Sequence, residues 1–133
     1  MIRYRDKSHG VTQISVKALK HIERLGKILY VRGYSYRHQF LETAVLVRGE
    51  NGTARFTGFA WGYGGSGPHG LKQLLQKINV ERSLVDKVLN IPWTTSNEIG
   101  EIWRVTFEQK GISNWNIFTM RGSNETIYTM YHQ

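Results

Sequence analysis

Hydrophobic residues recur along the chain with two different spacings, one typical of helices and one typical of strands. Apolar residues spaced three and four positions apart predict helices over 15–25, 71–78 and 81–90. Alternation of apolar and polar residues, or short runs rich in β-formers, predicts strands at 2–5, 27–34, 40–48, 53–61, 101–108, 114–120 and 126–131. Residues 94–100 follow neither period, which indicates a loop.

The order of these elements favours an α+β fold. A helical pair falls between two groups of strands, which is not the regular alternation of a doubly wound sheet. We expect antiparallel sheets, a central helical pair after a glycine-rich loop, and one N-terminal amphipathic helix. Strands 40–48 and 53–61 are expected to pair antiparallel, because Asn51-Gly52 suits a type I′ hairpin turn. The length of 133 residues predicts a single domain over 1–133.

Positive charge is concentrated in the first part of the chain. The formal net charge is +8, and residues 1–55 hold eleven Lys and Arg against four Asp and Glu, a balance of +7. Such asymmetry suggests an anionic partner for a surface built largely from this half. Part of the charge follows the predicted helix 15–25, at Lys17, Lys20, His21 and Arg24, where it is equally typical of a solvated helix face.

Several classes of protein find no support in the composition. The chain has no cysteine, which removes disulfides, thiolate zinc sites and cysteine nucleophiles. The lack of cysteine fits a cytoplasmic location best. We also see neither a signal peptide nor a run long enough to span a membrane. The five histidines form no recognisable pair and the carboxylates are scattered, so we expect no metal, no cofactor and no catalytic residues. Were the protein an enzyme, His69 would be the candidate acid.

A glycine-rich segment is the strongest candidate site. We call Trp61–Pro68, with the sequence WGYGGSGP, the glycine loop. A strand is predicted before it and a helix after it, and the N-terminus of a helix offers unpaired amides to an anion. Glycines let such a backbone approach a phosphate closely. The loop lacks the Gly-Lys-Ser/Thr ending of a P-loop, and a purely structural turn explains its glycines equally well.

Side chains near the glycine loop complete the candidate site. The rings of Trp61 and Tyr63 are candidates to stack on a base, or alternatively to pack in the core. Arg55 and Lys72 flank the loop and are candidates to pair with phosphate. The candidate ligand-binding residues are Arg55, Trp61, Tyr63, Gly64, Gly65, Ser66, Gly67, His69 and Lys72.

The stretch Gly58–Pro68, with the sequence GFAWGYGGSGP, and the Leu-rich helix after it resemble the hallmark of an uncharacterised bacterial and phage family of small proteins. The similarity covers residues 57–90. It implies a microbial or viral setting and no particular activity. In size, basicity and lack of cysteine the chain is also similar to phage sponges that sequester nucleotide immune signals, such as Thoeris anti-defence proteins.

These observations lead to one preferred function and three alternatives. We expect a non-enzymatic, homo-oligomeric binder, or sponge, of a small phosphorylated nucleotide signal, encoded by a phage and acting against host defence. The first alternative is a nucleic-acid-binding protein that uses the basic residues of 1–55. The others are a protein inhibitor of a host factor and an enzyme.

Overall fold

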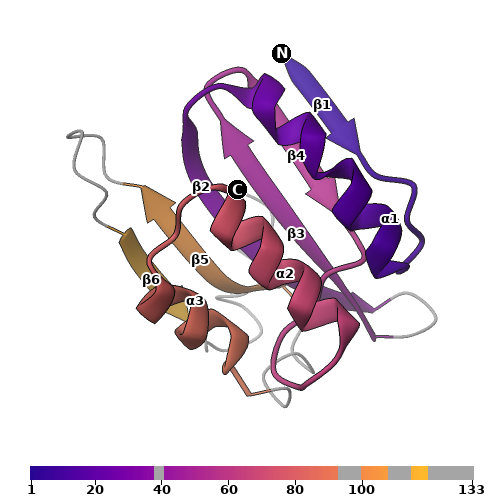
Figure 1. The fold of residues 1–133 in the computed structure, drawn as a ribbon, viewed down its shortest axis with the longest axis vertical. Helices are drawn as coiled ribbons and strands as arrows, with labels where there is room; N and C mark the ends of the chain where they lie inside the picture. The colour runs from indigo at the N-terminus through magenta and orange to yellow at the C-terminus, as the bar shows by residue number, and fades with distance from the viewer. Residues whose placement is uncertain (38–40, 93–99, 108–114, 120–133) are drawn as a thin grey trace.

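A six-stranded sheet organises the computed structural model, which describes residues 1–37, 41–92, 100–107 and 115–119 (Figure 1). The strand order is β1-β4-β3-β2-β5-β6. The strands are β1 (Ile2–Arg5), β2 (Ile28–Arg37), β3 (Leu41–Gly49), β4 (Gly52–Phe56), β5 (Gly100–Phe107) and β6 (Trp115–Thr119). The predicted α+β class is therefore confirmed.

The expectation of an antiparallel sheet is wrong at one edge. β1 runs parallel to β4, with Ile2 opposite Gly52 and Arg5 opposite Arg55, while the other described pairs are antiparallel. The chain reaches this arrangement because α1 and η1 carry it from β1 across one face of the sheet before β2 begins (Figure 1). The sheet is mixed.

The described helices all cover the same face of the sheet (Figure 1). They are α1 (Thr12–Lys17), the 3₁₀ helix η1 (Ala18–Leu25), α2 (Ser66–Lys77) and α3 (Arg82–Leu89). Alternation in the strands turns residues such as Val31, Val45 and Val105 toward these helices, where all three are fully buried. No described element covers the opposite face, which we call the open face.

Two predicted boundaries move because of tertiary contacts. The helix expected from residue 71 begins inside the glycine loop at Ser66, with Pro68 in its first turn, where a missing amide costs nothing. The strand expected over 53–61 leaves the sheet after Phe56, since the Thr57 amide donates to the Asp6 carboxylate instead of continuing the ladder. The strand predicted at 126–131 lies outside the described residues.

The hairpin between β3 and β4 forms, but the predicted turn is wrong. Its two central residues are Glu50 and Asn51, neither of which has positive φ, so the turn is not type I′. Their amides donate to the carbonyls of Lys27 and Leu25, both at 2.9 Å. Gly52 follows with φ 149°, and a Cβ there would lie 2.0 Å from the Ile2 carbonyl oxygen. Contacts with Leu25, Lys27 and β1 therefore determine the conformation of this turn.

Candidate functional site

The glycine loop does not gather the predicted residues into one site. Trp61 has no exposed surface and meets Trp103 edge-on, with the ring centroids 5.6 Å apart. This is core packing, the alternative considered for the aromatic pair, and it leaves no ring face for a base. Tyr63, in contrast, is 49% exposed.

The remaining loop residues border two separate hollows. Gly64, Gly65, His69 and Lys72 line one of about 450 Å³, beside Leu89 and Asn90. Ser66 and Gly67 line another of about 470 Å³, on the side of Tyr36 and Thr57. Tyr63 borders both. Among the described residues that line these two hollows, Lys72 is the one Lys or Arg, so little positive charge is collected there.

Different structural features account for the glycines of the glycine loop. Gly62 and Gly65 have φ of 87° and 153°, which side chains rarely adopt. Gly67 is closely packed, since a Cβ would lie 3.0 Å from the Ala60 Cβ. A Cβ on Gly64 would meet nothing within 4 Å. Three of the four glycines are therefore explained by the turn and its packing.

Arg55 belongs to a different surface, on the open face of the sheet. In β4 the alternation buries Ala54 and Phe56 against the helices and turns Thr53 and Arg55 the other way. The register places Arg3 beside Thr53 and Arg5 beside Arg55. On the far side of β4, Arg48 lies opposite Thr53 and Leu46 opposite Arg55. Three neighbouring strands thus bring four arginines to one area.

Further arginines continue this surface across the sheet. Tyr34 on β2 is the register partner of Ala44 on β3, and Arg32 is the partner of Leu46. On its other side, Arg32 lies opposite Arg104 on β5. We call the six side chains on these strands the arginine face: Arg3, Arg5, Arg32, Arg48, Arg55 and Arg104.

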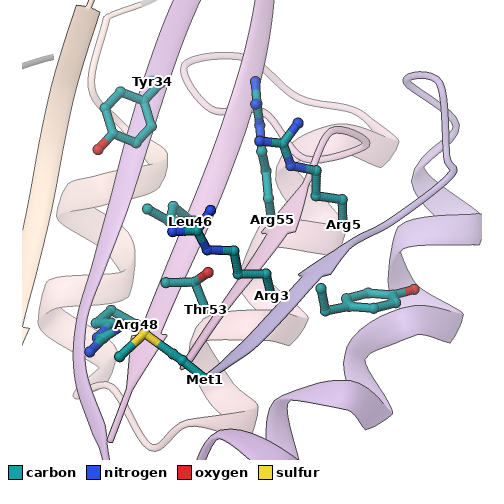
Figure 2. A pocket seen from close by; sticks show the side chains of 9 residues that line it. Met1, Arg3, Arg5, Tyr34, Leu46, Arg48, Thr53 and Arg55 are labelled. Atoms are coloured by element: carbon teal, nitrogen blue, oxygen red, sulfur yellow. Dashed lines mark hydrogen bonds between the residues drawn. The ribbon is translucent and has the colours of Figure 1, made fainter. Parts of the chain in front are cut away.

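The β1–β4–β3 part of the arginine face forms a hollow of about 420 Å³ (Figure 2). Figure 2 shows the guanidinium groups of Arg5 and Arg55 side by side, with Arg3 and Arg48 below them and Tyr34 beyond Leu46. None of these four arginines makes an ion pair with a carboxylate among the described residues. Arg48 donates to the Met1 sulfur at 3.0 Å, and Arg55 lies 5.4 Å from the centre of the Tyr36 ring.

The β2–β5 part contains a buried acid beneath two arginines. Glu101, whose side chain has no exposed surface, accepts hydrogen bonds from Arg104 Nε at 2.7 Å and Nη2 at 3.0 Å. Arg32 Nε lies 3.6 Å from the same carboxylate. A buried carboxylate is costly unless it is paired in this way. The hydrogen bonds to Glu101 raise the pKa of the Arg104 guanidinium, which therefore stays charged.

Tyrosines complete the open face. Burial raises the pKa of Tyr34 and of Tyr36 above the ordinary value, and a hydrogen bond to Glu42 raises the pKa of Tyr36 further. Both phenols therefore stay neutral at physiological pH. Arg32 lies over the Tyr30 ring, 4.3 Å from its centre, and donates to the Tyr34 hydroxyl at 3.2 Å.

Sequence reasoning identified the charge and Arg55 but missed the surface. The excess charge of residues 1–55 was linked to helix 15–25, yet that helix covers the face opposite the arginines (Figure 1). A usable signal was present in the period of two at Arg3-x-Arg5 and Arg32-x-Tyr34-x-Tyr36, which places each set on one face of a strand. Among the described residues, no group of three His, Asp or Glu suits a metal ion, and no helix is long and apolar enough to cross a membrane.

Comparison with known proteins adds no relative. No family model, curated protein or solved structure matches the chain. The resemblance of residues 57–90 to a bacterial and phage family stays a prediction, and the function has to be argued from the two surfaces described above.

Proposed function

We propose that the protein binds nucleic acid on its arginine face. The observation that carries this proposal is the segregation of arginine from lysine. Of the eight arginines with described side chains, six lie in strands on the open face, whereas none of the seven described lysines lies in a strand. A guanidinium presents a planar fork that matches a phosphate, while an ammonium acts as a point charge. If the positive charge served only solubility, arginine and lysine would be expected to share the same surfaces.

The arrangement of the arginines also supports an anionic ligand. Arg5 and Arg55 are direct register partners, a position in which like charges destabilise a sheet. Repulsion between unit charges about 4 Å apart is about 1 kcal/mol even in bulk water. Among the described side chains, the strands of the arginine face contribute six arginines against the two carboxylates Glu42 and Glu101. Phosphates would relieve this repulsion.

Salt-dependent binding tests the proposal. Fluorescence anisotropy with labelled oligonucleotides should give an affinity that falls linearly in a plot of log K against log salt. Four phosphate contacts on a single strand correspond to a slope of about −3. Arg55→Ala and Arg3→Ala should each weaken binding and make the slope shallower by about 0.7.

Matched controls come from the helical face. Lys72→Ala and Arg82→Ala remove the same charge from exposed positions on α2 and α3, and should leave affinity and slope unchanged. The proposal is wrong if no oligonucleotide binds at low salt. It is also wrong if the helical variants weaken binding as much as Arg55→Ala does.

A small phosphorylated nucleotide is the second candidate ligand, at the arginine face rather than at the glycine loop. The hollow of about 420 Å³ beside Arg3, Arg5, Arg48 and Arg55 supports it, because small-molecule sites measure roughly 300–1,000 Å³. A nucleotide sponge of phage origin would use such a site. Calorimetric titration with cyclic ADP-ribose isomers and cyclic oligonucleotides separates the two ligands. Saturable binding of one of them that survives high salt favours the sponge.

A further inference from the structure

The two parts of the arginine face differ in their net charge. In the β1–β4–β3 part, Arg3, Arg5, Arg48 and Arg55 make no ion pair with a described carboxylate. Counting Glu42 on β3, this part carries four positive formal charges against one negative. In the β2–β5 part, Arg32 and Arg104 share the Glu101 carboxylate and retain a single positive charge between them. Each part contains a cross-strand arginine pair, but only the second has an acid built beneath it.

The Glu101 carboxylate lowers the affinity of the β2–β5 part for phosphate, and it fixes the side chains of Arg32 and Arg104 in place. Arg104 uses two of its five N–H donors in hydrogen bonds to the Glu101 carboxylate. Arg32 lies near the same carboxylate and donates a hydrogen bond to the Tyr34 hydroxyl. Glu101 is fully buried, whereas the side chains of Arg32 and Arg104 are 18% and 23% exposed. Part of each arginine side chain therefore reaches the surface, whereas the Glu101 carboxylate and Arg32 Nε are buried.

The two guanidinium groups lie close to one aromatic ring, that of Tyr30. Arg32 lies over the Tyr30 ring at 4.3 Å, and Arg104 lies 5.9 Å from the same ring centre. Bases that have left a duplex stack on aromatic rings and on guanidinium planes. A surface that combines guanidinium planes with an aromatic ring and carries little net charge can bind a base face without requiring a phosphate.

From this division we infer that the ligand is single-stranded, with its phosphates on the β1–β4–β3 part and its bases on the β2–β5 part. The inference rests on the proposed function. Neighbouring strands are ~4.8 Å apart, so β3, β4 and β1 lie one, two and three strand spacings from β2, distances that a short single strand can span. In a duplex the bases are enclosed between the backbones, and only a single strand can contact both parts at once.

Three probes of equal length test the inference: a single-stranded oligonucleotide, its duplex, and an abasic single strand that has phosphates but no bases. At moderate salt the single strand should bind at least about tenfold more tightly than the other two, since each stacked base contributes substantially. Tyr30→Ala should weaken binding of the single strand by about tenfold and leave the abasic strand unchanged. Arg55→Ala should weaken binding of both strands.

Two further variants separate stacking from damage to the fold. Tyr30→Phe keeps the ring and should restore binding of the single strand. Glu101→Gln keeps the size of the side chain but frees Arg32 and Arg104 to bind phosphate, so binding of the abasic strand should become tighter. Thermal unfolding followed by circular dichroism shows whether each variant is folded.

The inference is wrong if the duplex binds as tightly as the single strand. It is also wrong if the Tyr30→Ala variant is folded and the substitution weakens binding of the single strand and of the abasic strand equally. Either result leaves the proposed function standing as long as Arg55→Ala still weakens binding. If no probe binds the wild-type protein, the proposed function fails and the inference fails with it.

Discussion

The carboxylate of Asp6 accepts hydrogen bonds from both the backbone amide of Thr57, at 3.2 and 3.3 Å, and its hydroxyl, at 3.1 Å. Ser8 donates to the same carboxylate at 3.1 Å, and so does Ser15 from the first turns of α1. Ser15 Oγ in turn accepts from the Gly58 amide at 2.9 Å. The cluster ties the end of β1, the start of α1 and the end of β4 together. It therefore holds in place the two strands that carry Arg3, Arg5 and Arg55.

Removing this carboxylate should destabilise the protein. Asp6→Ala removes the charged acceptor of the Thr57 amide and of three hydroxyls, although the Ser8 and Thr57 hydroxyls can still bond to each other. Hydrogen bonds to charged groups contribute roughly 1.5–3 kcal/mol each. We expect the free energy of unfolding, measured with urea, to fall by about 2–4 kcal/mol. The control is Glu23→Gln, which breaks the exposed ion pair with Lys77. It should change the free energy by less than about 1 kcal/mol. Equal effects of the two variants would contradict this role of Asp6.

Gly33 is required by close packing, whereas Gly64 is not. A Cβ on Gly33 would lie 2.0 Å from Trp103 Nε1, so Gly33→Ala forces the indole away from Trp61. We expect a loss of about 1–3 kcal/mol in the free energy of unfolding and a changed tryptophan fluorescence spectrum. Gly64→Ala meets open space and should stay within about 0.5 kcal/mol of wild type. A large loss for Gly64→Ala would show that the glycine loop has a requirement beyond its turn.

The raised pKa values of Tyr34 and Tyr36 predict a loss of stability at high pH. Burial is the main cause of both shifts. Because the folded state binds these protons more tightly, their contribution is fully present below the unfolded pKa of about 10 and is lost as pH rises through the folded pKa. Titration at 295 nm should show tyrosines that ionise later in the folded protein than in denaturant. The variant with both tyrosines replaced by phenylalanine should keep only the late phase of Tyr4, whose pKa is also raised by burial and by Asp6, and its stability should fall less above pH 10.

Arginine and lysine should not be interchangeable at Arg3. Arg3→Lys keeps the charge and loses the fork, so the salt slope should stay as in wild type. The affinity for a single-stranded oligonucleotide should fall by roughly two- to tenfold, on the order of one hydrogen bond. Anisotropy measured across a range of salt concentrations separates this result from that of Arg3→Ala, which should change the slope as well. Identical curves for Arg3→Lys and wild type would mean that only charge matters at this position.

Local patterns predicted the elements of the fold, but sequence-distant contacts changed their limits. The stripe at Leu71, Leu74 and Leu75 predicted α2, because one face of that helix is buried. The alternation through Phe59 and Trp61 overextended β4, since both residues reach the core from the segment after the strand. The parallel pairing of β1 with β4 had no local signal, because its partner residues lie 50 positions apart.

The candidate site was harder to predict for the same reason. The strand period places Arg3 and Arg5 on one face, but only the sheet order brings Arg48 and Arg55 beside them. Glu101 is brought onto the face of Arg104, three residues later, by the irregularity between Gly33 and Tyr34 in the β2–β5 register. Regular alternation would put residues 101 and 104 on opposite faces. The sequence alone therefore did not reveal the acid beneath the arginines.

The edge position of β1 has a kinetic consequence. Its ladder closes a loop of about fifty residues, whereas the hairpin of β3 and β4 closes over a two-residue turn. Long loops are entropically costly to close, so β1 should join the sheet after the hairpin has formed. An edge strand also opens most readily, and its amides should exchange with deuterium ahead of those in β3. A ligand that bridges Arg3 or Arg5 to Arg55 would slow that exchange, coupling occupancy of the arginine face to closure of the N-terminal strand.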